Sequence, residues 1–297
     1  MNPHHEWRLS DTAHPIRDAP FLEATHPGSM PTVLYGRGAR PDAFAASRVA
    51  VVGTRSATPM GLADARELGR FCARSGITLV SGLAIGIDAA AHEGALDAGG
   101  LTVGVVATGL DVVYPRRHER LFARVRDAGL IVGEHPDGTP PTAWRFPIRN
   151  RIIAAIADVV VVVEAATRGG ALHTARYAAQ YGRDVLALPA SRRNPVGNGT
   201  NRLLADGAVM LLDPTDLLVA LQQGRAGEAG WGCDRPPPAD PDQLSVFHAF
   251  GGDGATTEEL EHRSALPPER LGPALRALER TGRAERRRGM WWPATSR

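Results

Sequence analysis

The sequence predicts an α/β fold: a Rossmann-like, doubly wound and mainly parallel sheet, followed by a small C-terminal winged-helix domain. From Arg48 onward, short β-branched apolar runs alternate with segments of helical spacing, which is typical of a doubly wound sheet. Runs such as Val159–Val163 are apolar without interruption, which indicates strands buried on both faces and therefore a parallel sheet. A Gly- and Pro-rich stretch then separates this pattern from a shorter, mainly helical region.

The chain begins with residues 1–47, which have little periodicity and many Pro and Gly residues. We expect an irregular lead-in there, with a short strand near Val33–Tyr35. Residues 48–222 form the predicted Rossmann-like domain, whose helices include Leu62–Ala73 and Ala89–Ala98. Its expected strands are Val49–Gly53, Ile77–Ser81, Thr102–Ala107, Leu130–Gly133, Val159–Glu164, Val185–Pro189 and Ala208–Leu211.

Residues 223–241 are predicted to be a linker, because repeated glycines and the run Pro236–Pro238 cannot sustain a helix or a central strand. Residues 242–297 are predicted to form the winged-helix domain. Three short helical segments followed by a turn and strand over residues 282–293 are typical of that module. The helical segments are Asp242–Phe250, Thr256–His262 and Pro267–Thr281.

The basic residues of the chain are all arginine, 34 in number. The lack of lysine excludes Schiff-base chemistry and a P-loop lysine, so guanidinium groups must carry any phosphate binding. The stretch from Gly138 to Ala205 contains nine arginines and three acidic residues, although the whole chain has a formal net charge of only +2. This concentration of positive charge suits a polyanion, but a solvated face balanced elsewhere would have the same composition.

Several classes of protein are disfavoured. The longest apolar run is far shorter than the roughly 20 residues that cross a bilayer, and residues 1–15 are polar, unlike a secretory signal. Cys72 and Cys233 are too few and too far apart for a disulfide framework, and no Cys/His cluster has the spacing of metal ligands. We therefore expect a cytoplasmic protein that binds no membrane, metal or cofactor.

The first candidate site residues are Gly53, Thr54 and Arg55, which end the first strand shortly before a helix. Glycine permits a tight turn, the amides of the next helix point at whatever lies above the strand, and Arg55 adds a fixed charge. A plain turn between strand and helix would have the same pattern.

A second glycine turn follows the second predicted strand. Its candidate residues are Ser81, Gly82, Gly86 and Asp88. Ser81 could cap the turn or donate to an anion, and Asp88 could belong to the site or cap the helix, whose dipole favours an acid there. His92, one helical turn further on, could contact a ligand but is more often a packing residue.

The third and fourth candidate segments lie further along. In the third, basic and aromatic residues alternate, so that guanidiniums could grip phosphates from the beginning of a helix while a ring stacks on a base. Its candidates are Arg145, Phe146, Arg149, Asn150 and Arg151, of which Asn150 could instead hold a loop. In the fourth, Gly169 and Gly170 precede a helix that carries Thr174, which suits an anion. All four segments should meet at the carboxyl edge of one parallel sheet, where ligands bind in such folds.

Five short motifs resemble the DNA-processing protein A (DprA/Smf) family. The motifs are Gly53-Thr54-Arg55, Ser81-Gly82-Leu83-Ala84-x-Gly86-x-Asp88-x-x-Ala91-His92, Leu110-Asp111-x-x-Tyr114-Pro115, Phe146-Pro147-x-Arg149-Asn150-Arg151-Ile152-Ile153-Ala154 and Gly199-Thr200-Asn201. The resemblance runs from about Pro31 to Leu218. The fourth loop departs from the usual Ser-Gly-Ser-Leu-x-Thr-Ala, because Gly169 and Ala171 flank Gly170 and two hydroxyls are missing.

The resemblance implies a non-enzymatic, homodimeric protein that binds incoming single-stranded DNA and loads the RecA recombinase onto it during natural transformation. It places DNA contacts on Arg55, on Ser81 and Gly82, and on the segment Arg149–Arg151. It also places the dimer and RecA surfaces between about Thr174 and Leu218.

Two other functions are open to a chain of this kind. An enzyme similar to the LOG-like phosphoribohydrolases would need an acid just past the last glycine loop, but the helix after Gly170 carries no Asp or Glu before Asp184. A transcription factor led by the winged helix would need a basic module. Residues 240–297 contain nine acids and nine arginines, which disfavours that function.

Overall fold

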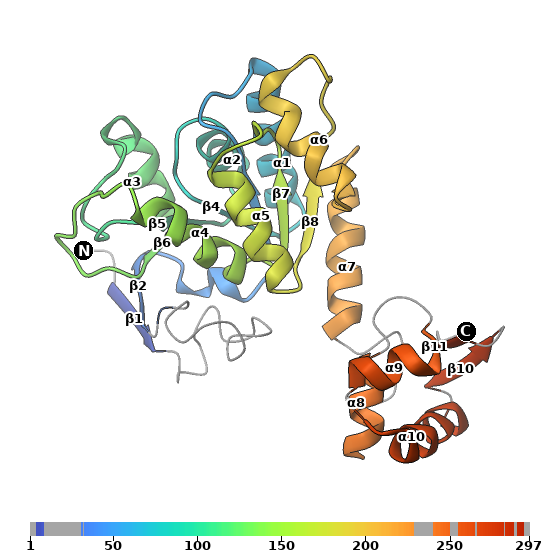
Figure 1. Cartoon of the computed structure of the whole chain (residues 1–297). Coiled ribbons are helices and arrows are strands. Elements are labelled where there is room, and N and C mark those ends of the chain that lie inside the picture. The colour runs from blue at the N-terminus through green and yellow to red at the C-terminus, as the bar shows by residue number, and fades with distance from the viewer. Residues whose placement is uncertain are drawn as a thin grey trace. The chain divides into compact units, whose positions relative to one another are not determined.

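The computed structural model describes residues 4–8, 31, 33–228, 240–249, 255–264, 266–281, 283–287 and 290–293. Contacts between residues divide the chain into two units, Met1–Leu221 and Gln222–Arg297 (Figure 1). Among the described residues, no helix has both the length and the apolar character needed to cross a bilayer.

The first unit is built on one sheet, whose strands within the described residues follow the order β1-β2-β6-β5-β4-β3-β7-β8-β9. These strands are β1 (His4–Arg8), β2 (Val33–Gly38), β3 (Arg48–Val52), β4 (Thr78–Ser81), β5 (Thr102–Val106), β6 (Leu130–Gly133), β7 (Val159–Val162), β8 (Asp184–Ala187) and β9 (Val209–Met210). From β6 across to β9 every pairing is parallel. The chain moves outward from β3 to β6 and returns to the other side of β3 with β7. This reversal is the topological switch point, where ligands bind in such sheets.

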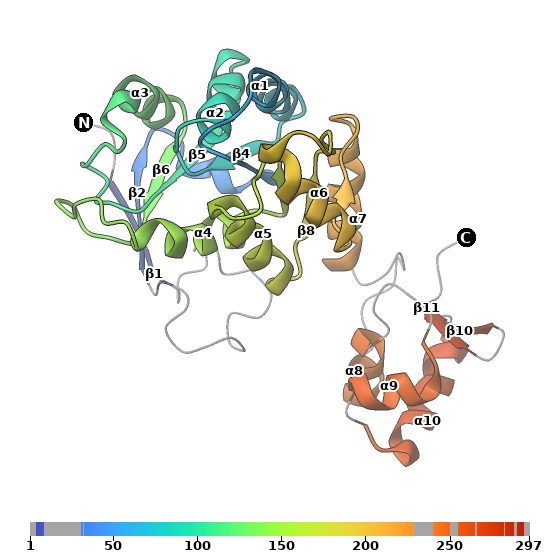
Figure 2. The same ribbon diagram turned by 45° about the horizontal axis from the view of Figure 1, so that its top comes forward.

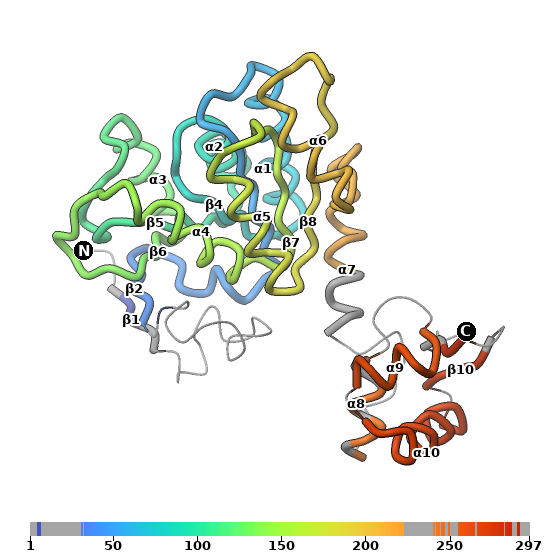
Figure 3. The backbone as a smooth tube through the Cα atoms, in the orientation of Figure 1, coloured from blue at the N-terminus to red at the C-terminus, as the bar shows by residue number. Residues whose placement is uncertain are grey.

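Helices cover both faces of the sheet (Figure 2). One face carries α1 (Pro59–Arg74), α2 (Ile87–Asp97), α3 (Glu119–Ala128) and α7 (Asp216–Glu228), and the other carries α4 (Arg145–Ile156) and α5 (Gly170–Gln180). The backbone trace shows α4 and α5 side by side (Figure 3). The shorter α6 (Asn198–Ala205) contacts β8.

Successive strand residues explain this double cover. Val49 and Val51 pack with α1 and α2, whereas Ala50 and Val52 pack with α4 and α5. Because side chains alternate between the two faces of a strand, each central strand needs an unbroken apolar run. The seven parallel strands predicted from such runs are confirmed, with ends that differ by at most two residues. The mainly parallel α/β fold is confirmed with them.

The prediction for residues 1–47 is wrong at one segment. The strand expected near Val33–Tyr35 is present as β2, which pairs antiparallel with β6. Strand β1 lies in a stretch expected to be irregular, and it pairs antiparallel with β2. Because β1 is mostly polar, its pairing with a distant strand specifies it, as is common at a sheet edge. Residues 9–30 lie outside the described residues.

The second unit contains α8 (Pro241–Ala249), α9 (Thr257–Ser264), α10 (Pro268–Arg280) and the antiparallel pair β10 (Ala284–Arg287) and β11 (Met290–Pro293). All three helices stand where the sequence predicted them. Their core includes Leu260, Leu271, Leu275, Leu278 and Trp291.

The beginning of the predicted linker is also corrected. Helix α7 continues to Glu228, so residues 223–228 are helical. Leu217, Ala220 and Leu221 anchor its first turns in the core of the sheet, and this packing stabilises the helix beyond the point where glycines alone would end it. The remainder of the predicted linker, residues 229–239, lies outside the described residues.

Candidate functional site

A cavity of about 480 Å³ lies at the carboxyl ends of β3 and β7, at the switch point of the sheet. All four predicted segments contribute to it, which confirms that they meet at one edge. Among the described residues its lining includes Gly53, Thr54, Arg55, Asp88, Tyr114, Phe146, Arg149, Asn150, Arg168, Gly169, Gly170 and Thr174. A smaller cavity of about 90 Å³ adjoins it and shares Arg55, Tyr114, Phe146 and Arg149 with it. Three guanidiniums and one carboxylate line the larger cavity, so its charge is positive.

Arg149 lies in the floor of this cavity, and its guanidinium is buried in the protein instead of reaching out from the beginning of α4. It is only 4% exposed, and its Nη1 donates to the carbonyls of Gly82, at 2.8 Å, and Val105. The prediction that Arg149 grips phosphates from the beginning of α4 is therefore wrong in its geometry. Arg149 has the same helical spacing as Ile153 and Ile156, and this spacing was a signal that it faces the core.

Asp88 is the buried partner of Arg149. It is 6% exposed, and its Oδ2 accepts a hydrogen bond from the backbone N–H of Gly82 at 3.1 Å. Burial raises the pKa of Asp88, while the charge of Arg149 and backbone hydrogen bonds from Ala84, Gly82 and Gly53 oppose the rise. Burial lowers the pKa of Arg149 to about 10, against the opposing effect of Asp88. Arg149 therefore stays charged at neutral pH, and Asp88 fills the amide pocket that the sequence assigned to an external anion.

Gly82 makes this arrangement possible, because a Cβ there would lie 2.6 Å from Nη2 of Arg149 and 2.7 Å from Oδ2 of Asp88. Gly86 begins α2 with a φ of +85°, and a Cβ there would collide with the carbonyl of Thr54. Both glycines thus hold the first two loops together. Ser81 is fully buried, and its hydroxyl donates to the carbonyl of Val51 at 2.6 Å. The prediction that Ser81 faces a ligand is wrong, since its side chain fastens β4 to β3.

The fourth loop is held from below by α4. Nδ2 of Asn150 donates to the carbonyl of Gly170 at 3.0 Å, so Asn150 holds a loop, which was one of its two predicted roles. The hydroxyl of the buried Thr174 also points to that carbonyl, at 3.5 Å. Gly169 and Gly170 themselves are exposed. The backbone of this loop, and not the hydroxyl of Thr174, is therefore what the fourth segment offers to a ligand.

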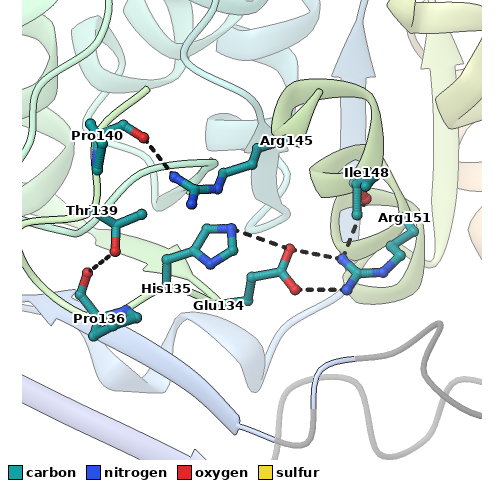
Figure 4. Close-up of polar contacts among 8 residues, drawn as sticks. All are labelled: Glu134, His135, Pro136, Thr139, Pro140, Arg145, Ile148 and Arg151. Atoms are coloured by element: carbon teal, nitrogen blue, oxygen red, sulfur yellow. Dashed lines mark hydrogen bonds and ion pairs between the residues drawn. The ribbon is translucent and has the colours of Figure 1, made fainter. Parts of the chain in front are cut away.

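Arg151 points away from the cavity. Its guanidinium binds both carboxylate oxygens of Glu134, at 3.0 and 2.7 Å, and its Nη1 also donates to the carbonyl of Ile148 (Figure 4). His135 lies beside Glu134, and burial lowers the pKa of His135. Arg145 donates to the carbonyl of Pro140 at 2.8 Å. The predicted phosphate contact at Arg151 is therefore wrong, because this side chain fastens α4 to the end of β6.

Aromatic side chains form the rim of the cavity. Phe146 is half-buried, and its ring centroid lies 5.1 Å from that of Tyr114. The guanidinium of the exposed Arg55 lies over the face of Phe146, 5.7 Å from its centroid. This places a ring and a fixed positive charge side by side at the opening, a pairing that the sequence pattern did not predict.

Three further contributors were not predicted as site residues: Arg168, which lines the cavity, Glu164 and Tyr114. Glu164 accepts hydrogen bonds from the backbone N–H and the hydroxyl of Thr58, at 2.9 and 2.6 Å, and Thr58 in turn caps α1. An acid that directly follows a buried strand was the available signal for this contact. Tyr114 appeared only within a family motif, and nothing local indicated that its ring would reach Phe146.

Comparison with known proteins agrees with this geometry. Residues 12–222 match the model of the family described as DNA recombination-mediator protein A. A putative DNA processing protein DprA from Mycobacterium tuberculosis is 41% identical over 272 residues, which are 89% of this chain and 69% of that protein. The DNA processing protein DprA of Streptococcus pneumoniae is 37% identical over 216 residues, which are 73% and 71% of the two chains.

Solved structures are also similar to this chain. The X-ray structure of DprA from Streptococcus pneumoniae superimposes with a TM-score of 0.65 at 33% identity, over 73% of this chain and 74% of the other. A structure of DNA processing protein A from Helicobacter pylori, described for its single-stranded DNA binding mode, gives 0.63 at 28% identity, over 75% and 99%. The region matched by the family model, residues 12–222, contains the strands from β2 to β9 and the residues that line the cavity. The chain therefore belongs to the DNA recombination-mediator protein A (DprA/Smf) family.

Proposed function

We propose that the first unit binds single-stranded DNA in the cavity at the carboxyl edge of the sheet. The observation that carries the proposal is the opening itself, where the exposed guanidinium of Arg55 lies over the face of Phe146. A base that is free of a duplex can stack on an aromatic ring while a guanidinium neutralises the neighbouring phosphate. The positive lining of the cavity and the family's name support the same conclusion.

The bound strand is expected to contact Arg55, Arg168 and the exposed backbone of Gly169 and Gly170, all of which line the cavity. Backbone amides at the beginning of α5 favour an anion. Arg149 contributes charge from the floor without projecting toward the strand. Because each neutralised phosphate releases counterions, the affinity should fall with salt at a log–log slope of about −0.7 per phosphate.

The test is binding of fluorescent oligo-dT, measured by anisotropy. Arg55→Ala should weaken binding about tenfold or more, since it removes a contact to phosphate and the guanidinium over Phe146. Arg74→Ala is the matched control: Arg74 is an exposed arginine at the other end of α1, and its loss should leave the affinity unchanged. Equal affinity of Arg55→Ala and the native protein would refute the site. Arg149→Ala is a poor test, because it would leave the buried Asp88 unpaired and destabilise the fold.

We further propose that the chain acts as a binding protein and not as an enzyme. Among the described residues that line the cavity, Asp88 is the one carboxylate, and it is held by Gly82 and Arg149 beneath the surface. A LOG-like hydrolase needs an acid free to exchange protons with its substrate. Release of free base from AMP or a cytokinin-type monophosphate would contradict this proposal.

We propose that the chain forms a homodimer through the edge of the sheet at β9. Val209, Met210, Leu212 and Val219 are exposed apolar side chains in this region, and a cavity of about 690 Å³ beside them is lined by residues of α5, α6, β8 and β9. An unpaired apolar edge favours association with a second strand. Sedimentation of Met210→Glu should show a monomer, and a dimer would exclude this surface.

We also propose that residues 242–297 form a winged helix. The bridge between Ala255 and Trp291 beside β10 and β11 supports this proposal.

We also propose that the chain acts in the cytoplasm in natural transformation, by loading RecA onto incoming single-stranded DNA. Family membership supports this proposal. RecA filament assembly on DNA coated with single-strand binding protein is the direct measurement. Assembly at the same rate with and without this chain would contradict RecA loading.

A further inference from the structure

We infer that Trp144 is a second base-stacking platform, outside the cavity, which receives a base of the DNA strand as it leaves Phe146. The inference rests on the proposed binding of single-stranded DNA and adds a contact residue to it. Four observations support it: the exposure of the ring, its place on the rim, the guanidinium on its face, and the rigidity of the segment that presents it.

Trp144 is 57% exposed and Tyr114 is 42% exposed, and these are the large aromatic side chains classed as exposed in the described residues. One exposed ring on a protein surface needs no explanation. Here, however, both rings belong to segments that form the same opening. Tyr114 lines the cavity and contacts Phe146, and Trp144 follows Ala143 directly and precedes Phe146 by two residues, which both line the cavity. The exposed aromatic side chains of the described residues are therefore carried by the segments at the mouth of the cavity.

Trp144 repeats the arrangement found at Phe146. The guanidinium of Arg145 lies 5.2 Å from the centroid of the Trp144 ring, as that of Arg55 lies 5.7 Å from Phe146. A guanidinium over one face of a ring leaves the other face for a base and places a positive charge close to the phosphate of the same nucleotide. Two such pairs in succession match a polymer in which bases and phosphates alternate.

The segment that carries Trp144 is fastened on both sides. Arg145 donates to the carbonyl of Pro140, and Arg151 binds Glu134 with two hydrogen bonds (Figure 4). The hydroxyl of Thr139 closes the turn at Pro136. A ring held by such a segment loses little conformational freedom on binding, which raises the affinity that stacking can contribute.

A protein partner is the competing occupant. Ile148 follows Trp144 by one helical turn and is 38% exposed, so the two form a small apolar pair. We favour DNA because Arg145 lies on the ring itself and the positive cavity adjoins it. A docking site for an apolar helix would instead bring uncharged surface together around these two side chains.

The test compares the full chain with the variants Trp144→Ala, Trp144→Phe and Ile148→Ala, using oligo-dT of about 4 and about 16 nucleotides, which span the site sizes of single-strand binding surfaces. Trp144→Ala should weaken binding of the long oligonucleotide about 5- to 150-fold, the range for loss of one stacked base. It should change binding of the short oligonucleotide much less. Trp144→Phe keeps a ring and should restore most of the affinity, and Ile148→Ala should bind as the native protein does.

Tryptophan emission gives a second readout that a merely structural role would not change. Stacking should quench part of the emission when oligo-dT binds, and that part should be missing in Trp144→Phe, which retains the other four tryptophans. The inference is overturned if Trp144→Ala binds both oligonucleotides normally, or if quenching is the same in both proteins. If the native chain binds no oligo-dT, the proposed function itself fails. Normal binding by Trp144→Ala alongside weak binding by Arg55→Ala removes only the inference and leaves Trp144 and Ile148 to a protein partner.

Discussion

The sequence pattern assigned the side chains of Arg149, Asp88 and Ser81 to a ligand. In the structure these side chains instead bind the backbone of the protein itself. Each is a polar residue at the end of a strand or within the first two turns of a helix at the carboxyl edge of the sheet, where both uses are common. Local composition cannot separate the two, because the partners lie far away: Arg149 binds carbonyls 67 and 44 residues distant, and Ser81 binds one 30 residues distant. Arg55 has no such distant hydrogen-bond partner among the described residues, because it lies exposed in the loop after β3, so its predicted position at the opening agrees with the structure.

The buried imidazole of His92 should make the stability of the fold depend on pH. It is fully buried, and its Nδ1 lies 2.6 Å from the hydroxyl of Thr102. That hydroxyl donates to the carbonyl of Leu79, so it accepts a hydrogen from Nδ1 of a neutral ring. Burial lowers the pKa of His92 from 6.5 to about 3, with smaller contributions from the charges of Arg149 and His118.

The unfolded chain therefore binds a proton at His92 that the folded chain does not between pH 6.5 and about 3. Above pH 6.5 His92 is neutral in both states and the free energy of unfolding keeps its full value. Below pH 6.5 the free energy of unfolding falls by about 1.4 kcal/mol per pH unit, because only the unfolded chain takes up the proton. The free energy of unfolding, measured by urea unfolding at several pH values, should fall less steeply with decreasing pH in His92→Gln than in the native protein. His173→Gln, at an exposed position, should keep the native slope, and equal slopes for native protein and His92→Gln would be evidence against a buried neutral ring.

At the scale of elements, prediction succeeded wherever the pattern is local. Unbroken apolar runs marked β3 to β8 because both of their faces are covered, and helical spacing marked α1 and α2. It failed at β1, whose described residues are polar, and at the end of α7, which continues through glycines because its first turns are packed in the core. In both cases contacts with distant residues override the intrinsic preference of the segment.

The junction between β4 and α2 allows a test at this scale. Gly86 and Gly99 both have positive φ, +85° and +74°, so an alanine at either position costs roughly 1–2 kcal/mol of backbone strain. Gly99 has open space around it, whereas a Cβ at Gly86 would meet the carbonyl of Thr54 and lie 3.0 Å from Cα of Arg55. In urea unfolding, Gly86→Ala should lose clearly more stability than Gly99→Ala. It should also weaken oligo-dT binding because it displaces Arg55, and equal losses in both variants would show that the loops do not touch.

At the scale of the whole molecule, the chain consists of two units with separate cores. The core of the second unit, which includes Leu275 and Trp291, shares no residue with the clusters of the first. The division was predictable from the composition of residues 223–241, and the location of the cavity from the four glycine or arginine segments expected at the carboxyl edge of the sheet. The function of the second unit was not predictable, because the nine acids and nine arginines of residues 240–297 balance.

Separate cores should unfold separately. Leu275 is 1% exposed, so Leu275→Ala should destabilise the second unit by about 2–5 kcal/mol. Calorimetry should show two transitions, of which only one moves to lower temperature in this variant, while the affinity for oligo-dT stays the same. Leu79→Ala, in β4 of the first unit, should move the other transition. A single transition that shifts as a whole would mean that the two units stabilise each other.

The carboxyl group of Asp88 also bears on the state of the loops before any ligand binds. Many phosphate-binding loops take their final shape only around the anion that they hold. In this chain the carboxylate of Asp88 already satisfies the backbone of Gly53, Gly82 and Ala84, and a covalently attached group cannot diffuse away. The loops therefore have a partner within the chain that needs no bound anion, and such preorganisation would lower the cost of binding the proposed DNA strand.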